Sequence, residues 1–329
     1  ISSSKYQSLT NPANYSPLTN RATEGQYAPG STFKLFTAYA AIDGNFLTGT
    51  GRMPSVDTRL DDNGYFDLSK FDKCVGEKCV FTNSLDGRGK PETYRDVDLR
   101  RAITVSSDTY FYRIGAEIGL SKNDRAIQTA AELFGLGRVT GVQLTGEASG
   151  VIPDKALKKA RHQENPTAFP FGDWTTGDNI NVAVGQGDVL VTPLQLANAY
   201  ATFANDGHLY APNIASQVKA LDGSVVRTFD PRELARIEMN EAARQPILEG
   251  LLGVTSWRDD TSGVQGTAYD AFKNAGVDLD QFPIAGKTGT AEVQGKADTA
   301  LFAAFGPAPD PSKPNTAGVA PRYAMVVVL

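Results

Sequence analysis

The sequence is poor in the side chains that most often hold metals or act as general bases. Its 329 residues include only two histidines, His162 and His208, and two cysteines, Cys74 and Cys79. The histidines stand far from the cysteines, so neither a metal site nor a Ser-His-Asp triad is expected. The net charge of −5 is spread along the chain without a long basic run, which argues against nucleic-acid binding. No run of about eighteen apolar residues occurs, so the sequence predicts no membrane-spanning helix.

The two cysteines stand in one short segment, Lys-Cys-Val-Gly-Glu-Lys-Cys-Val at residues 73–80. Gly76 favours a turn that brings the two thiols together. The spacing therefore predicts a small-loop disulfide between Cys74 and Cys79, which indicates an oxidising compartment. Two free thiols are the alternative.

Apolar residues recur at helical spacing through much of the chain, whereas its last part alternates like a sheet. The sequence thus predicts an α+β fold in one domain, 1–329, with a helical part at about 31–260 and a sheet-forming part at about 280–329. Residues 45–95 are expected to form a long loop with a short hairpin, and 155–161 a solvated helix face. Helices are expected at 31–42, 96–105, 110–118, 125–136, 192–201 and 241–252, and strands at 215–221, 225–229, 284–291, 299–305 and 323–329.

A serine and a lysine stand at the start of the most apolar helical segment, after a Pro-Gly turn. Ser31 and Lys34 are three residues apart, so on a helix they share a face. A buried lysine has a lowered pKa, which suits a base beside a nucleophile. The alternative is that Ser31 merely caps the helix. The same spacing at Ser2 and Lys5 lies in a polar stretch and predicts no chemistry.

Two further polar groups interrupt apolar elements. Ser106-Ser107-Asp108 separates two helical segments, where Asp108 is alternatively a simple N-cap. Lys287-Thr288-Gly289-Thr290 places a cation, two hydroxyls and a glycine on one expected strand, which suits a ligand carboxylate and an oxyanion. The alternative for that strand is an exposed end with a solvated lysine.

These three groups, in this order, resemble the S-x-x-K, S-x-D and K-T-G motifs of penicillin-recognising acyl-serine enzymes. Residues 20–34, and Gly-Gln-Gly at 185–187 followed by Thr-Pro-Leu-Gln-Leu-Ala at 192–197, resemble the transpeptidase domain of class B penicillin-binding proteins. The aspartate of the second motif is similar to that of the elongation-type branch, penicillin-binding protein 2. The resemblance implies an antiparallel sheet packed with helices, plus a mainly helical subdomain.

The resemblance also implies roles for the motif residues. Lys34 would take a proton from Ser31, which attacks the carbonyl between two D-alanines of a peptidoglycan stem peptide. Ser106 would pass protons to and from the amines, and Asp108 would orient Lys34 or the substrate amide. Backbone N–H groups of Ser31 and Thr290 would form the oxyanion hole.

In the third motif, Lys287, Thr288 and Thr290 would hold the substrate carboxylate, with Gly289 allowing its close approach. No metal or organic cofactor is implied. A D,D-carboxypeptidase and a non-enzymatic β-lactam sensor are alternatives that keep these motifs, whereas a β-lactamase lacks support because no loop clearly carries its glutamate.

The resemblance finally implies partners and a location. Expected ligands are D-Ala-D-Ala stem peptides and β-lactams, and the expected protein partner is a membrane glycan polymerase. The expected location is the extracytoplasmic face of the bacterial cell membrane, with an anchor upstream of this chain. Both ends look truncated, because the sequence opens with Ile1 rather than Met and finishes in an apolar run at 324–329. The family usually also has a β-hairpin before this point and a C-terminal helix after the last strand.

Overall fold

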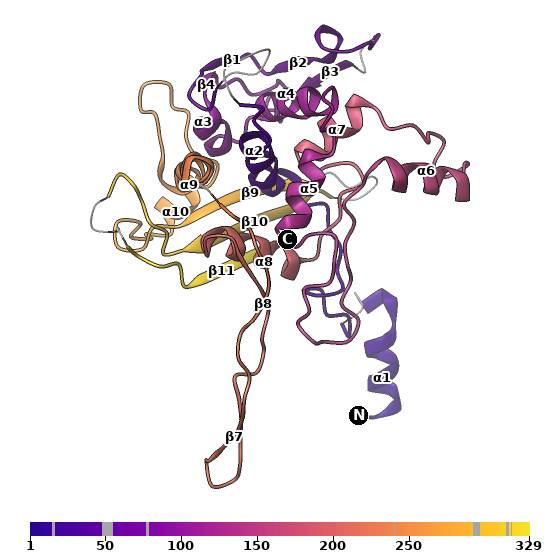
Figure 1. Ribbon diagram of the computed structural model, residues 1–329, viewed down its shortest axis with the longest axis vertical. Helices are drawn as coiled ribbons and strands as arrows, with labels where there is room; N and C mark the ends of the chain where they lie inside the picture. The colour runs from indigo at the N-terminus through magenta and orange to yellow at the C-terminus, as the bar shows by residue number, and fades with distance from the viewer. Residues whose placement is uncertain are drawn as a thin grey trace.

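A three-stranded antiparallel sheet underlies the helices of the molecule (Figure 1). The computed structural model describes residues 1–14, 17–47, 55–76, 79–239, 241–291, 297–313, 316 and 318–329. Its strands are β9 (Ala285–Ala291), β10 (Thr299–Gly306) and β11 (Tyr323–Val328), in the order β11-β10-β9. The register places Lys287 opposite Ala303. The three strands predicted for the end of the chain are therefore confirmed.

Two long helices pack against this sheet. Helix α8 (Pro193–Ala204) lies on β10 and β11, and α9 (Glu241–Ser256) lies on β9 and carries α10 (Tyr269–Asn274) beside it. Helix α8 begins where the sequence predicts a helix, and the structure shows there a capping box between Thr192 and Gln195 and a proline in the first turn.

The helix of the first motif lies in the centre of the core. A 3₁₀ turn, η2 (Gly30–Phe33), leads into α2 (Lys34–Asp43), so the prediction of a regular helix from residue 31 was wrong for its first turn. The helix ends before Gly44 as predicted. Three buried aromatic side chains come from η2 and α2: Phe33, Phe36 and Tyr39. They form ring contacts with one another and with Phe134 and Tyr200 from other parts of the chain.

Helices α3, α4 and α5 pack against α2. Helix α4 also packs on α7. Helix α6 has no buried residue, which confirms the predicted solvated face. The bounds of these helices are α3 (Leu99–Thr104), α4 (Asp108–Gly119), α5 (Ala126–Leu133), α6 (Lys155–Glu164) and α7 (Thr176–Ala183).

The segment between the first two motifs is more ordered than a long loop. Strand β1 (Leu60–Asp62) pairs with β4 (Arg95–Val97), and β2 (Tyr65–Asp67) pairs with β3 (Val80–Thr82), with η3 (Leu68–Lys70) after β2. Four aromatic rings, Phe66, Phe71, Phe81 and Tyr112, pack together beside Cys79 and tie the two-stranded ladder β2–β3 to α4. Long-range packing, rather than a local pattern, orders this segment.

Two parts extend away from the body in Figure 1. Strands β5 (His208–Ala211) and β8 (Arg232–Arg236) form the base of an arm whose tip is the hairpin of β6 (Gln217–Lys219) and β7 (Val225–Thr228). The predicted hairpin is thus confirmed, with a first strand shorter than expected. The second extending part contains α1 (Ser3–Thr10) and η1 (Pro12–Asn14). Ser2, three residues before Lys5, is the N-cap of α1. In the described part of the chain, no helix combines the length and the apolarity that a bilayer requires.

Candidate active site

Ser31 lies in the 3₁₀ turn that precedes α2, and its side chain is half-buried. Neither η2 nor α2 is capped by a side chain, so the alternative in which Ser31 serves as a helix cap is wrong. The hydroxyl is therefore not occupied in holding the helix. Lys34 is the first residue of α2, directly after the turn.

The turn of Ser31 packs backbone to backbone against the third motif. Gly30 has a φ of +51°, and a Cβ at this position would lie 2.4 Å from the carbonyl oxygen of Thr290. From the strand side, a Cβ on Gly289 would lie 2.8 Å from the carbonyl oxygen of Pro29. Only glycines fit this contact, which brings Ser31 and Thr290 to neighbouring positions.

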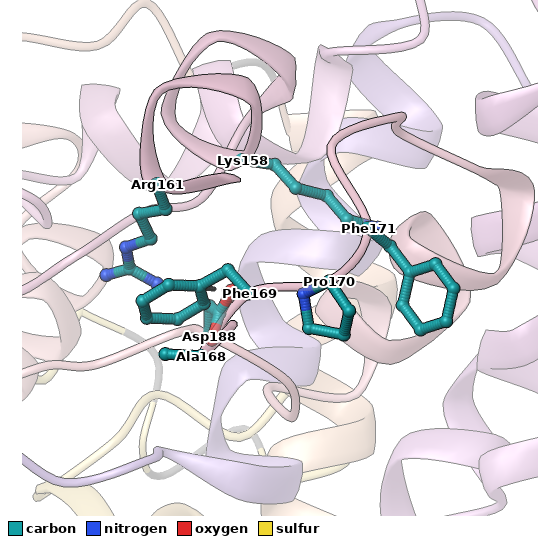
Figure 2. A pocket seen from close by; sticks show the side chains of 7 residues that line it. All are labelled: Lys158, Arg161, Ala168, Phe169, Pro170, Phe171 and Asp188. Carbon is teal, nitrogen blue, oxygen red and sulfur yellow. Dashed lines mark ion pairs between the residues drawn. The ribbon is translucent and has the colours of Figure 1, made fainter. Parts of the chain in front are cut away.

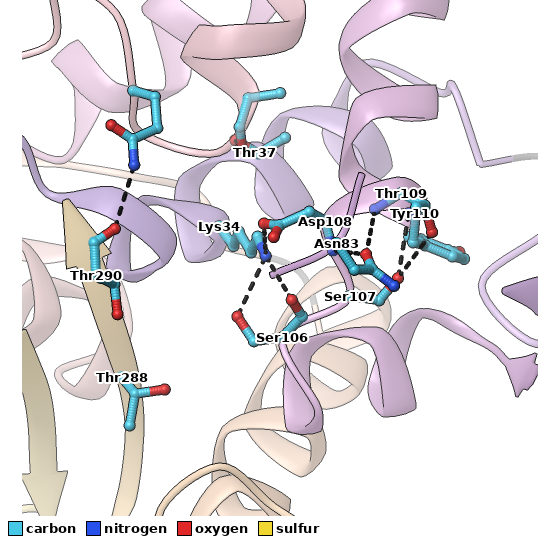
Figure 3. A network of polar contacts seen from close by, with 12 residues as sticks. Lys34, Thr37, Asn83, Ser106, Ser107, Asp108, Thr109, Tyr110, Thr288 and Thr290 are labelled. Carbon is cyan, nitrogen blue, oxygen red and sulfur yellow. Dashed lines mark hydrogen bonds and ion pairs between the residues drawn. The ribbon is translucent and has the colours of Figure 1, made fainter. Parts of the chain in front are cut away.

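The amine of Lys34 is surrounded by acceptors of the second motif (Figure 3). Its Nζ donates to Asp108 Oδ1 at 2.6 Å, to Ser106 O at 2.8 Å and to Ser106 Oγ at 3.2 Å. Nζ also lies 5.3 Å from the centroid of the Phe111 ring. The structure thus brings Lys34 into contact with Ser106 and Asp108, which follow it by more than seventy residues in the sequence.

Burial governs the protonation of this lysine. Its side chain has no exposed surface, and burial lowers the pKa of Lys34, while the carboxylates of Asp108 and, more weakly, Asp62 oppose that shift without cancelling it. A lysine with a lowered pKa accepts a proton more readily near neutral pH than an exposed lysine does. A buried amine that follows a hydroxyl-bearing turn in the chain suits the chemistry of a general base.

The second motif has an unusual backbone. Ser106 adopts a φ of +62°, in the left-handed region that non-glycine residues rarely occupy. Ser107 is the N-cap of α4, its Oγ accepting from Tyr110 N at 3.2 Å, so the interpretation of Asp108 as a simple cap was wrong. Asp108 stands instead in the first helical turn, with its carboxylate on Lys34.

The third motif presents a buried cation and two hydroxyls. Lys287 has no exposed surface, so the alternative of a solvated lysine was wrong; burial lowers its pKa well below the usual value, and the charge of Lys34 lowers it further. Thr288 Oγ1 lies 2.6 Å from Thr267 Oγ1, and the carbonyl of Thr290 accepts from Gln186 Nε2 at 3.2 Å. The strand is thus fixed on both flanks.

Sequence reasoning missed four side chains that support this cluster. Thr267 and Gln186 contact the third motif, while Asp62 and Asn83 contact the second. Asp62 was visible only as part of a turn signal, and Gln186 only through the Gly-Gln-Gly resemblance. Nothing in the sequence singles out Asn83 or Thr267, because their roles depend on partners far along the chain.

The structure joins Cys74 to Cys79 by a disulfide. Both cysteines lie among described residues, whereas residues 77–78 between them lie outside these. The disulfide joins Cys74, in the segment after η3, to Cys79, which directly precedes β3. Among the described residues, the buried cluster that contains Cys79 includes no residue of the three motifs, so the bond contributes to the scaffold.

Two surface cavities lie outside the cluster. One, of about 170 Å³, is lined by side chains of α6 and the loop after it, including Lys158, Phe169 and Phe171 (Figure 2). The other, of about 280 Å³, lies between α3 and α9 beside Arg101 and Trp257. Neither is lined by a motif residue, and the described chain holds no cluster of three or more metal-binding side chains.

Comparison with known proteins places this geometry in a family. The model of the penicillin binding protein transpeptidase domain matches residues 2–319. The peptidoglycan D,D-transpeptidase MrdA of Haemophilus influenzae is 32% identical over 89% of this chain and 38% of its own length. The protein of the same name from Escherichia coli K12 is 30% identical over 90% and 40%. The chain therefore spans about two fifths of these relatives.

Solved structures show the same fold. Pseudomonas aeruginosa PBP2 in complex with WCK 5153 aligns with a TM-score of 0.71 and 27% identity, covering 100% of this chain and 62% of that one. Penicillin-binding protein A of M. tuberculosis, as an imipenem acyl-enzyme complex, aligns with a TM-score of 0.65 and 25% identity over 99% and 59%. These findings confirm the predicted fold and the resemblance drawn from the three motifs, and the chain belongs to the penicillin-binding protein transpeptidase family.

Proposed function

We propose that this chain is the catalytic domain of a peptidoglycan D,D-transpeptidase of the elongation type. The observation that carries the proposal is the contact of Lys34, which follows the turn of Ser31 in the chain, with both Ser106 and Asp108. Relatives named peptidoglycan D,D-transpeptidase MrdA support it. The single transpeptidase domain, with its helical part over about 31–260 and sheet-forming part over about 280–329, is part of the same proposal.

In the first step, neutral Lys34 takes the proton of the Ser31 hydroxyl. The oxygen then attacks the carbonyl carbon between the two D-alanines of a stem peptide, and the carbonyl oxygen becomes an oxyanion. Backbone N–H groups of Ser31 and Thr290 stabilise that charge, and the close approach of their two segments supports this part of the proposal. The amine of Lys287 and the side chains of Thr288 and Thr290 hold the terminal carboxylate.

In the second step, the C–N bond breaks and the leaving amine needs a proton. Ser106 Oγ, at 3.2 Å from Lys34 Nζ, passes that proton on from the lysine, and D-alanine departs. The amine of a second stem peptide then attacks the acyl-enzyme, loses a proton along the same path, and leaves a cross-link and free Ser31. Asp108 keeps Lys34 oriented through both steps.

The same proposal covers partners and location. The ligands are D-Ala-D-Ala stem peptides, with β-lactams as their mimics, and the protein partner is a membrane glycan polymerase. An imipenem acyl-enzyme of an M. tuberculosis relative supports the β-lactam ligands. A similar chain in a peptidoglycan synthase complex, described as coordinating polymerization and crosslinking, supports the polymerase partner. We place the domain on the extracytoplasmic face of the bacterial cell membrane.

The test is covalent labelling by a fluorescent penicillin, followed over hours and mapped by mass spectrometry. A lasting adduct on Ser31 that is lost in Ser31→Ala is expected. With pairs of stem peptides, release of D-alanine together with a cross-linked dimer is expected. An adduct on another residue would refute the site, D-alanine release without any dimer would favour a carboxypeptidase, and a lasting adduct without D-alanine release would favour a β-lactam sensor.

A further inference from the structure

The first turn of α4 is capped by side chains from outside the helix. Asn83 Oδ1 accepts from Asp108 N at 2.9 Å and from Thr109 N at 3.0 Å, and Ser107 Oγ accepts from Tyr110 N at 3.2 Å (Figure 3). The first N–H groups of a helix have no partner within the helix. Here three of them are satisfied by two side chains, so the position of the turn is tied to those side chains.

The orientation of Asn83 is itself fixed. Only 2% of this residue is exposed, and its Nδ2 donates to both carboxylate oxygens of Asp62, at 2.9 and 3.0 Å, and to Glu92 O at 2.9 Å. With Oδ1 already accepting two N–H groups, every donor and acceptor of the amide has a partner. If the amide were flipped, Nδ2 would face the N–H groups of Asp108 and Thr109, and Oδ1 would face the oxygens of Asp62 and Glu92. The contacts therefore allow one orientation of the amide.

Asp62 completes the connection to the second motif. It is 3% exposed, and its Oδ2 accepts from Ser107 Oγ at 2.6 Å while its Oδ1 accepts from Gly64 N at 2.9 Å. The carboxylate thus holds both Asn83 and Ser107. Strand β1 and the residue after β3 are joined in this way to the start of α4.

This network stands directly behind the acceptors of Lys34. Ser106, with its left-handed backbone, immediately precedes the N-cap Ser107, and Asp108 is the first residue of α4. The carbonyl and hydroxyl of Ser106 and the carboxylate of Asp108 therefore face Lys34 only while that turn stays in place. Neither Asn83 nor Asp62 itself donates to or accepts from the lysine.

We propose that Asn83 and Asp62 are positioning residues for the acyl-transfer reaction: they hold the first turn of α4 so that Ser106 and Asp108 surround Lys34. The inference rests on the proposed function. A small displacement of groups that transfer protons lowers the rate of chemistry more than it lowers ligand binding. The residues therefore act on the acylation step rather than on recognition.

The experiment measures acylation by a fluorescent penicillin in rapid mixing, separating the noncovalent dissociation constant from the acylation rate constant. For Asn83→Ala, the rate constant is expected to fall about 10- to 100-fold, with an unchanged dissociation constant. Rates are compared on the pH plateau of each protein, so that a change in the protonation of Lys34 does not enter.

The matched control is Asn179→Ala. Asn179 is also fully buried, and its amide donates to Asp124 O at 2.9 Å and accepts from Trp174 Nε1 at 3.1 Å, away from the three motifs. Both variants should lower the melting temperature, because each leaves buried polar groups without partners. Only Asn83→Ala should lower the acylation rate constant.

A second variant covers the case in which Asn83→Ala does not fold. Asp62→Asn keeps the side-chain shape but has one acceptor oxygen in place of two, and a reduced acylation rate constant is again expected. Acylation rates equal to that of Asn179→Ala in both folded variants would overturn the inference while leaving the proposed function intact. A wild-type protein that penicillin does not label would overturn both.

Discussion

Replacing Gly30 by alanine is expected to move Ser31 away from strand β9, because the added methyl group has no room there. The φ of Gly30 is +51°, and an added Cβ would meet the carbonyl oxygen of Thr290 at 2.4 Å and its carbonyl carbon at 2.9 Å. Cβ atoms essentially never approach another heavy atom within 3.0 Å. Because both contacts are with backbone, Gly30→Ala must move the turn of Ser31 away from β9 by at least half an ångström.

The cost has two parts. A non-glycine residue in the left-handed region costs about 1 to 2 kcal/mol, which predicts a melting temperature lowered by a few degrees. A displacement of about 1 Å within a catalytic arrangement costs about 100-fold in rate. Gly30→Ala is therefore expected to lower the acylation rate constant about 10- to 100-fold in a protein that still folds.

The assay is labelling by a fluorescent penicillin in rapid mixing, with thermal unfolding measured in parallel. Gly223→Ala is the matched control, because Gly223 has a φ of +87° and an added Cβ there would meet nothing within 4 Å. The control carries the backbone strain without the clash, so it should lose a little stability and no acylation rate. Wild-type acylation by Gly30→Ala would refute the reasoning.

Other predictions concern the charged groups and the disulfide. Lys34→Ala should fold and lose acylation, and retained speed in the penicillin assay would contradict its role as base. Asp108 raises the pKa of Lys34, so Asp108→Asn should lower that pKa and move the rising limb of the acylation pH profile to lower pH; an unmoved limb would contradict this. Lys287→Ala should weaken noncovalent binding of penicillin about tenfold or more, because it removes a charged partner of the ligand carboxylate, and calorimetric or rapid-mixing affinities check this. Mass spectrometry without reductant should find Cys74 linked to Cys79, and reduction should lower the free energy of unfolding by about 2 kcal/mol through loss of a short loop constraint, whereas two freely alkylated thiols would contradict the bond.

The elements that the sequence predicted well are those with strong local signals. The helix predicted at 192–201 corresponds to α8, and the alternation of apolar residues predicts the three strands of the sheet. The three motifs could be identified because each combines costly residue types, such as Lys34 in an apolar helix, with a fixed order along the chain. Such features are visible without any knowledge of tertiary contacts.

The errors arose where long-range contacts override local preference. Ser31 was placed in a regular helix, but the approach of Gly30 to Thr290 holds the turn in 3₁₀ form. Aspartate is a common N-cap residue, so Asp108 was one candidate for the cap of α4. In the structure, Ser107 is the N-cap, and the carboxylate of Asp108 accepts a hydrogen bond from Lys34 instead. Asn83 carries no signal at all, since its partners lie on β1 and α4 and only the folded chain brings them together.

Within the proposed function, the two buried lysines link recognition of the ligand to chemistry. The charge of Lys34 lowers the pKa of Lys287. Because repulsion between two charges is mutual, a proton on Lys287 would oppose a charge on Lys34. A substrate carboxylate beside Lys287 would favour its protonated form, because a nearby opposite charge stabilises a buried cation. That proton on Lys287 would in turn favour neutral Lys34, the form able to accept the proton of Ser31. Asp108 raises the pKa of Lys34 and so favours its charged form. Within the proposed mechanism, binding of the substrate carboxylate beside Lys287 opposes this effect and favours the neutral form of Lys34 that accepts a proton.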